Sequence, residues 1–383
     1  MKTRAEAFGA WVRLDEPPAL VAVDRALARR LGVVGGAAWG AEPPAPAPLE
    51  VHLAVTSRCG AGCPGCYLDA TPDGEEPPFE VVAARLSALA RAGVFTVAFG
   101  GGEPLSRADL GRLAQHARSE GLSPVTTTSG IGLTPARARE LRAFEQVNVS
   151  YDGPGESYRA VRGFDGARVA ERAMTFLRDA EVPFGVNVVL TRVTFDAVEA
   201  AVSRAHELGA REVQLLRYKP AGRARGLAYY EMRLTAAQVD AVPALLARLA
   251  ARADVRVRID CAMVPFLAPI VEDVGDLVRL GVFGCEAGRH LAAGRVDGAL
   301  APCSFADAAS TPIDALGEEW ATDPSAAAFR AHAASLPAPC ASCPVAEVCR
   351  GGCRVVAAHA GDASAADPEC PRVRADRERR DVS

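Results

Sequence analysis

The residues of this chain that are best suited to chemistry are its eleven cysteines, ten of which fall into two groups. Three of them form a tight triplet with the spacing Cys59-x3-Cys63-x2-Cys66. Glycines occupy three of the five intervening positions, so the backbone there can fold closely around an inorganic object. Short loops that bring several thiolates together are typical of iron–sulfur clusters. The triplet therefore indicates a cluster rather than disulfides.

The second group consists of seven cysteines between residues 285 and 370. Their spacing is Cys285-x12-Gly298-x4-Cys303, then Cys340-x2-Cys343-x5-Cys349-x3-Cys353, then Cys370. Seven thiols exceed the four ligands of one tetrahedral zinc site, although a structural zinc ribbon that binds a partner stays open as the alternative. Cys261 lies outside both groups.

Three ligands leave one iron of a four-iron cluster open to an exogenous ligand. In this respect the chain resembles the radical S-adenosylmethionine (radical SAM) enzymes, whose signature is this triplet with an aromatic residue, here Tyr67, beside the last cysteine. The resemblance implies that the open iron chelates the amino and carboxylate groups of S-adenosylmethionine. One electron then cleaves the cofactor to methionine and a 5′-deoxyadenosyl radical, which the protein positions and shields.

Further motifs of that family recur and imply contacts with S-adenosylmethionine. The run Gly100, Gly101, Gly102, Glu103, Pro104 resembles the GGEP motif, whose glutamate and backbone hold the methionine amino group. Ser129 stands where the family often has an asparagine. Ser150 and Asp152 match its Ser-x-Asp-Gly motif, which approaches the ribose and methionine portions, although Asp and Gly also favour ordinary turns. Arg162 would reach the methionine carboxylate, or is a solvated surface arginine.

The seven later cysteines resemble the SPASM extension of the same family at every interval. By that resemblance an outer four-iron cluster is held by Cys340, Cys343, Cys349 and Cys370. An inner cluster is held by Cys285, Cys303 and Cys353, and its fourth ligand is missing from the motif. Either Cys261 completes this site, or the inner cluster keeps an open iron and Cys261 is a buried thiol. The chain would then carry three [4Fe-4S] clusters.

The elements that must position these residues follow from the alternation of apolar runs and amphipathic stretches. Six strands alternating with helices imply an α/β fold with a parallel sheet and right-handed crossovers. This count matches the partial (β/α)6 TIM-like barrel of the radical SAM family. The triplet follows the first strand, at the carboxyl end, where parallel α/β folds place active sites. The expected strands are Val51–Val55, Val94–Gly100, Pro124–Thr128, Val147–Tyr151, Phe184–Leu190 and Glu212–Arg217.

The expected domain order places the partial barrel at residues 51–217. Residues 1–50 form an N-terminal segment and linker, with a helix-like stretch at Pro18–Gly32 and an extended linker at Pro43–Pro48. The remaining parts are a bridging region (218–284), the cysteine-rich SPASM domain (285–372) and a charged, frayed tail (373–383).

Composition restricts the class of protein. The net charge of −4 offers no basic surface for nucleic acid. No signal peptide opens the chain, and no apolar run is long enough to span a bilayer. We therefore expect a cytoplasmic enzyme, with no nucleic-acid or membrane partner, in a compartment where clustered thiols stay reduced and bind metal.

Members of the SPASM group mainly modify peptides or proteins, so the resemblance implies a maturase of a ribosomally synthesised peptide. The expected outcome is a thioether or carbon–carbon crosslink. The alternatives are epimerisation, an anaerobic sulfatase-maturating (formylglycine-forming) reaction, or a small-molecule radical SAM dehydrogenase. Sulfatase maturases carry an aspartate base directly after the second cysteine of the extension, where this chain has Ser304. Expected partners are a reductant such as ferredoxin or flavodoxin, and a separate leader-peptide recognition protein, because residues 1–50 are too few for a typical recognition module.

Overall fold

A ten-stranded sheet forms the centre of the molecule, in the order β10-β9-β8-β7-β6-β5-β4-β11-β12-β13. The computed structural model describes residues 2–15, 18–40, 47–252, 254–279 and 281–382. Neighbouring strands from β4 to β10 all pair in parallel. They are β4 (Glu50–Thr56), β5 (Thr96–Gly101), β6 (Ser123–Thr128), β7 (Gln146–Ser150), β8 (Phe184–Leu190), β9 (Glu212–Arg217) and β10 (Arg256–Ile259). The α/β class and all six expected strands are confirmed.

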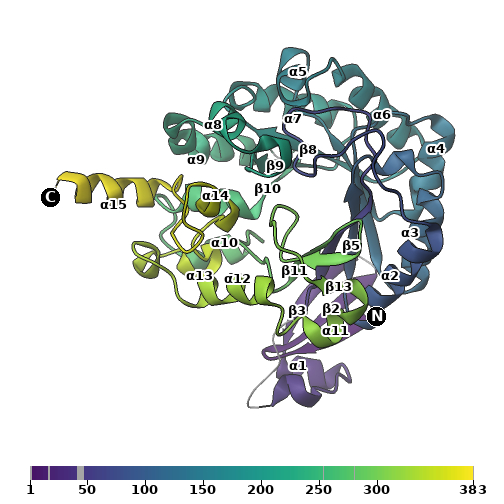
Figure 1. The fold of residues 1–383 in the computed structure, drawn as a ribbon, viewed down its shortest axis with the longest axis horizontal. Coiled ribbons are helices and arrows are strands. Elements are labelled where there is room, and N and C mark those ends of the chain that lie inside the picture. The colour runs from purple at the N-terminus through teal and green to yellow at the C-terminus, as the bar shows by residue number, and fades with distance from the viewer. Residues whose placement is uncertain (1, 16–17, 41–46, 253, 280, 383) are drawn as a thin grey trace.

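The helices between these strands lie on the outer side of the curved sheet (Figure 1). Alternate residues of β4, Val51, Leu53 and Val55, are buried under them, whereas the residues between face the concave side. The helices end where the sequence predicts, as at Gly93, whose φ of +83° suits glycine. They are α2 (Phe79–Arg91), α3 (Leu110–Ser119), α4 (Pro135–Glu140), α5 (Glu156–Arg162), α6 (Ala167–Asp179) and α7 (Val198–Glu207).

Strands from outside the expected barrel extend the sheet at both edges. At one edge β10 pairs with β9, after the helices α8 (Leu227–Met232) and α9 (Ala236–Ala250). At the other edge β11 (Leu291–Gly294) pairs in parallel with β4 and places Ala293 opposite His52. The short strands β12 (Ala299–Ala301) and β13 (Thr311–Pro312) follow in antiparallel order. The later cysteine-rich segment is thus hydrogen-bonded directly to the strand that precedes the triplet.

The N-terminal segment differs from the prediction. Pro18–Gly32 is not one helix: its first half is strand β3 (Pro18–Asp24), which pairs with β2 (Gly9–Asp15), and β2 pairs with β1 (Lys2–Glu6). Only α1 (Arg25–Arg30) is helical, and Asp24 caps it by accepting a hydrogen bond from the Leu27 N–H. Residues 43–46 of the expected linker lie outside the described residues.

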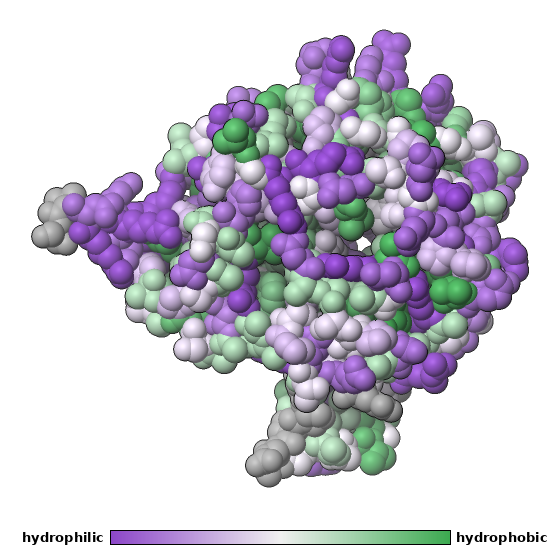
Figure 2. All heavy atoms as spheres, in the orientation of Figure 1, coloured by the Kyte–Doolittle hydropathy of each residue, from purple (hydrophilic) through white to green (hydrophobic). Residues whose placement is uncertain are grey.

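This N-terminal unit packs below the sheet, where the Arg4 guanidinium donates to the carbonyls of Pro48 and Gly93. Several apolar side chains stay on its surface, and Figure 2 shows green residues at the foot of the molecule. The exposed apolar side chains of this unit include Phe8, Leu14, Leu20, Val21, Leu27 and Leu31, each 36–45% exposed.

Apart from strands β11 to β13, the regular structure after β10 consists of short helices. They are α10 (Val274–Arg279), α11 (Leu316–Glu319), α12 (Pro324–Ala334), α13 (Ala346–Cys349), α14 (Arg354–His359) and α15 (Pro371–Val382). The expectation of a frayed tail is wrong. Helix α15 includes residues 373–382 and projects from the molecule as a strongly hydrophilic helix (Figure 2). Buried Val373 anchors this helix, and Asp376 pairs with Arg380 one turn later at 2.9 Å. In the described part of the chain, no helix is long and apolar enough to cross a membrane.

Candidate functional site

The cysteine triplet lies in the loop that joins β4 to α2, at the carboxyl end of the parallel strands. The Cys59 N–H donates to the Thr71 carbonyl at 2.8 Å, which fixes the start of the loop. Its other end is held by Arg223: the guanidinium Nε donates to the Cys63 carbonyl at 3.0 Å, and the backbone N–H donates to the Cys66 carbonyl at 2.9 Å. Hydrogen bonds therefore hold the backbone of the loop at both ends.

The end of β5 packs against this loop with backbone touching backbone. The Gly102 N–H donates to the Thr56 carbonyl at 2.7 Å, and the Glu103 N–H donates to the Arg58 carbonyl at 2.7 Å. A Cβ on Gly102 would lie 2.0 Å from the Arg58 oxygen, so only glycine fits there. Gly101 has a φ of +108° and equally little room. The glycines of the run thus bring Glu103 beside the triplet.

Glu103 is buried, and both of its carboxylate oxygens accept hydrogen bonds. Oε1 accepts from the Thr128 hydroxyl at 2.6 Å and from the Leu105 N–H at 3.1 Å. Oε2 accepts from the N–H and the hydroxyl of Ser129, at 2.8 and 2.5 Å. Ser129 thus lies in the predicted region and orients Glu103 through a side-chain and a backbone contact. Pro104 is buried directly after it.

Asp152 and Arg162 form an ion pair that reaches the triplet. Arg162 Nε donates to Asp152 Oδ2 at 2.6 Å, and Asp152 Oδ1 accepts from the Val189 N–H at 2.7 Å. Arg162 also lies beside Cys63: burial raises the pKa of the Cys63 thiol, and Arg162 lowers it in part. Arg162 is therefore not a free surface arginine. Ser150 is buried two residues before Asp152, at the end of β7.

Four of the later cysteines line a single cavity together with Pro265 and Arg372. They are Cys340, Cys343, Cys349 and Cys370, the set expected to hold the outer cluster. Burial, together with the neighbouring Cys370 and Cys343, raises the pKa of the Cys340 thiol to about 11. Metal binding at such thiols must release protons, because the ligand is the thiolate.

The remaining four cysteines of the chain lie close enough to affect one another's pKa. They are Cys261, Cys285, Cys303 and Cys353. Burial raises the pKa of Cys261 well above its ordinary value, and Cys285 and Cys353 add to the shift. Cys303 and Cys353 act in the same way on Cys285. Cys261 is thus a member of this group and not a distant core thiol, which the spacing alone left open.

A lysine lies beside this inner group. The Lys219 ammonium forms a buried ion pair with Asp260 and sits 4.4 Å from the centre of the Phe305 ring. Burial lowers the pKa of Lys219, but Asp260 and the thiols of Cys261 and Cys353 outweigh burial and raise it. The ammonium therefore stays charged beside these cysteines.

Phe305 connects the inner group to the triplet. Its ring centre lies 4.9 Å from that of Tyr67, which directly follows Cys66. Burial raises the pKa of Tyr67 to about 12, so its hydroxyl stays neutral. Lys219 and Phe305 were missed by motif reasoning. One signal was present, since Lys2 and Lys219 are the only lysines in a chain that otherwise uses arginine.

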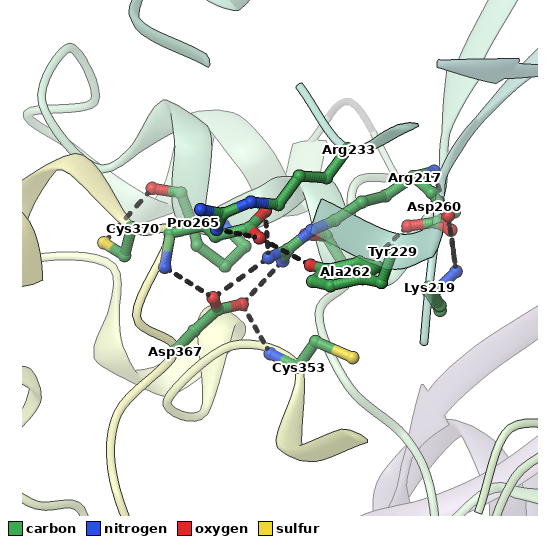
Figure 3. Close-up of polar contacts among 11 residues, drawn as sticks. Arg217, Lys219, Tyr229, Arg233, Asp260, Ala262, Pro265, Cys353, Asp367 and Cys370 are labelled. Carbon is green, nitrogen blue, oxygen red and sulfur yellow. Dashed lines mark hydrogen bonds and ion pairs between the residues drawn. The ribbon is translucent and has the colours of Figure 1, made fainter. Parts of the chain in front are cut away.

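A buried network of charges joins the sheet to the cysteine-rich segment (Figure 3). The Arg217 guanidinium donates to both oxygens of Asp367, at 2.6 and 3.0 Å, and to Glu369 at 2.9 Å. Asp367 also accepts from the N–H of Cys353 at 3.0 Å, and Glu369 immediately precedes Cys370. The network therefore positions one cysteine of each later group.

The donor chemistry of these sites fits iron–sulfur clusters. Among the described residues, no three or more His, Cys, Asp or Glu side chains converge as they would around a single metal ion. In a four-iron cluster each thiolate binds a different iron, so its ligands surround a volume and not a point. Four thiols around one cavity have this arrangement.

A parallel α/β sheet whose first parallel strand leads into a three-cysteine loop, with Glu103 held beside it, defines a class of enzyme. A family model described as the radical SAM superfamily matches residues 53–205, which carry all of these features. The class is the radical SAM enzymes, which use S-adenosylmethionine and a [4Fe-4S] cluster.

Comparison with known proteins narrows the class. A PqqA peptide cyclase of Ruegeria pomeroyi is 32% identical over 345 residues, covering 85% of this chain and 88% of that protein. The PqqA peptide cyclase of Streptomyces rochei is 31% identical and covers 86% and 91%. The chain belongs to the radical SAM superfamily and, within it, to the family that contains the PqqA peptide cyclases.

Solved structures share the fold. Streptococcus suis SuiB bound to its precursor peptide SuiA has 15% identity and a TM-score of 0.77, with coverage of 97% of this chain and 98% of that one. The enzyme anSMEcpe, bound to AdoMet and a peptide, has 19% identity and a TM-score of 0.67, with coverage of 85% and 95%.

Proposed function

We propose that this enzyme is a peptide maturase that joins two residues of a ribosomally synthesised peptide by a carbon–carbon or thioether bond. The relatives named above act on the peptide PqqA as cyclases, and the structural neighbour SuiB binds a precursor peptide. The observation that carries the proposal is the contact of Phe305 with both Tyr67 and Lys219. Through it an inner cluster, as an electron acceptor, would lie next to the place where a hydrogen atom is removed.

Each cofactor has residues to hold it. Cys59, Cys63 and Cys66 would bind the first [4Fe-4S] cluster. Cys340, Cys343, Cys349 and Cys370 would bind the outer one, and Cys261, Cys285, Cys303 and Cys353 the inner one. S-adenosylmethionine would lie against Tyr67, Gly100–Pro104, Ser129, Ser150, Asp152 and Arg162. When bound, the first cluster and S-adenosylmethionine supply a 5′-deoxyadenosyl radical that removes a hydrogen atom from the substrate.

The other partners belong to the same proposal. A ferredoxin or flavodoxin supplies the electrons, and a separate leader-peptide recognition protein presents the substrate in the cytoplasm. A sulfatase-maturating reaction is disfavoured, because a serine, Ser304, stands where those enzymes carry an aspartate directly after the second cysteine of the extension.

The test uses anaerobically reconstituted protein with dithionite and S-adenosylmethionine. The peptide probes are the PqqA of Ruegeria pomeroyi and the small peptides encoded beside this chain's own gene. We expect 5′-deoxyadenosine and a peptide that has lost two hydrogen atoms by mass spectrometry. The variant with Cys59, Cys63 and Cys66 all changed to Ala should give neither product. Activity on a sulfatase peptide instead, or cleavage of S-adenosylmethionine by the triple variant, would contradict the proposal.

Iron content provides a second test. Three four-iron clusters require about twelve irons per chain, and the triple variant should keep about eight. About four irons in fully reconstituted wild type would mean that the later cysteines hold zinc or no metal.

A further inference from the structure

Three polar side chains form a hydrogen-bonded chain that none of the cofactor motifs uses. His52 Nδ1 lies 2.8 Å from the Ser304 hydroxyl, and His52 Nε2 lies 2.9 Å from Glu50 Oε1. Glu50 and His52 are alternate residues of β4, so both face the concave side of the sheet. Ser304 comes from the loop after β12, which the pairing of β11 with β4 brings alongside.

The hydrogen bonds give this chain a direction. Burial raises the pKa of Glu50, but the hydrogen bond and charge of His52 and the charge of Arg258 outweigh it and hold the pKa below its ordinary value. An ionised carboxylate only accepts, so His52 Nε2 carries its hydrogen and donates to Glu50. In the neutral imidazole, Nδ1 is then the acceptor of the Ser304 hydroxyl. A proton can therefore pass from Ser304 to His52, and Glu50 stabilises the resulting imidazolium.

Ser304 lies between the inner cysteine group and the triplet loop. It stands between Cys303 of the inner group and Phe305, whose ring contacts Tyr67 beside the triplet. The side chains of His52 and Glu50 keep 41% and 44% of their surface exposed, although protein surrounds them. These two side chains therefore remain accessible, as side chains that exchange a proton with a substrate must be.

Crosslinking leaves one proton that needs an acceptor. When a carbon–X bond replaces a C–H and an X–H bond, the peptide gives one hydrogen atom to the 5′-deoxyadenosyl radical and one electron to an oxidised iron–sulfur cluster. The remaining product is the proton of X–H, where X is the sulfur or carbon atom that attacks. A base beside the attacking atom is required to take it.

We propose that Ser304, His52 and Glu50 are a proton relay that removes the proton of the attacking group of the peptide. The relay rests on the proposed crosslinking function and adds its acid–base residues. Ser304 receives the proton at Oγ and passes its own hydrogen to His52 Nδ1. The charged groups described around the relay are Arg258 of β10, which acts on Glu50, and Glu212 of β9, which pairs with Arg258 at 3.5 Å.

The first experiment compares the reconstituted variants His52→Asn, Ser304→Ala and Glu50→Gln on the peptide that wild type crosslinks. The matched control is His116→Asn. Its imidazole lies 3.2 Å from the Ser87 hydroxyl and 3.8 Å from Glu120, in a similar trio on the outer helices. His52→Asn should slow crosslinking about a hundredfold or more, the usual effect of losing a general base. Transfer of deuterium from labelled peptide to 5′-deoxyadenosine should continue in this variant. Formation of 5′-deoxyadenosine and formation of crosslinked peptide then become uncoupled. His116→Asn should behave as wild type in both measurements.

The pH profile separates a relay from a structural role. The dependence of crosslinking on pH should differ between wild type and His52→Asn, because the relay needs His52 Nδ1 free to accept a proton. A variant that crosslinks at the wild-type rate with the wild-type profile would overturn the relay. Joint loss of 5′-deoxyadenosine, iron and crosslinking would also overturn the relay. That pattern would mean that the three side chains hold the fold together and do not move a proton.

A second experiment needs no peptide. Nitrogen NMR of histidine-labelled holoenzyme should show His52 with a hydrogen on Nε2 and none on Nδ1, assigned by its absence in His52→Asn. Ser304→Ala and Glu50→Gln should each shift that signal, whereas His116→Asn should not. A His52 signal that ignores both substitutions, or that has the opposite tautomer, would overturn the relay. If wild type crosslinks no peptide, the proposed function fails, and this experiment still decides whether the relay exists.

Discussion

At the scale of single residues, Glu103 illustrates how a departure from the family motif is accommodated. Ser129 replaces the asparagine that is common at its position. Its hydroxyl and N–H both donate to the Glu103 carboxylate, so the shorter side chain still orients the glutamate. The motif alone predicted that both residues lie near the cofactor. It did not predict their contact, because a hydrogen bond across 26 residues depends on where two strands end.

Glu103→Gln should weaken the binding of S-adenosylmethionine. The substitution keeps the shape of the side chain but removes the charge that, in the proposed binding mode, faces the amino group of S-adenosylmethionine. Hydrogen bonds to charged groups contribute roughly 1.5–3 kcal/mol, so the dissociation constant should rise about 10- to 100-fold. Anaerobic calorimetry on reconstituted protein measures it, with Glu145→Gln on the surface as control. Unchanged affinity would place the cofactor elsewhere.

Cys261 is the residue whose surroundings the structure reveals most clearly beyond what its sequence position indicates. Spacing left its role open, whereas the structure places its thiol in electrostatic contact with Cys285 and Cys353. Cys261→Ala should change the electron paramagnetic resonance signal of one auxiliary cluster and reduce crosslinking. Cleavage of S-adenosylmethionine should continue, because the triplet lies in a different loop. If the spectra are unchanged and only stability falls, as when a buried side chain is lost, Cys261 is ordinary core and the inner cluster keeps an open iron.

At the scale of elements, the parallel strands were predictable because each is a short apolar run between clear helix stops. The N-terminal strand β3 was not. Leu20, Val23, Leu27 and Leu31 fit the helical period by coincidence, and pairing with β2 decided the conformation of the first half. Strands β11 to β13 were also missed, because two to four residues are too short to show a period.

The contact between the end of β5 and the triplet loop predicts that a substitution to alanine harms the protein at Gly102 but not at the nearby Gly100. Gly102→Ala would place a Cβ 2.0 Å from the Arg58 oxygen and must push the loop away, whereas a Cβ on Gly100 meets nothing within 4 Å. Gly102→Ala should lower the unfolding temperature and abolish formation of 5′-deoxyadenosine. Gly100→Ala should unfold at the wild-type temperature, because the added Cβ meets no protein atom. Equal behaviour of the two variants would mean that the loop yields easily and that this contact does not position the cluster.

At the scale of the whole molecule, the Arg217 network links the sheet to the cysteine-rich segment. Arg217 pairs with Asp367, 150 residues later in the chain, and both side chains are almost completely buried. No local pattern predicts such a pair, because its partners meet only after the whole fold has formed. The pair also fixes the backbone beside two cysteines, since Asp367 accepts from the Cys353 N–H and the next acid, Glu369, precedes Cys370.

Arg217→Met should therefore damage stability and cluster assembly together. The substitution leaves the Asp367 and Glu369 carboxylates buried without their cation, and breaking a buried ion pair in this way costs about 3–5 kcal/mol. Urea unfolding of the reconstituted protein should shift accordingly, and the iron content should fall while the triplet cluster remains. Glu199→Gln is the control. It breaks the Arg248–Glu199 pair, whose side chains are 57% and 50% exposed, and such a pair contributes at most about 1 kcal/mol. If Arg217→Met unfolds like this control and keeps all its iron, the network does not hold the two parts together.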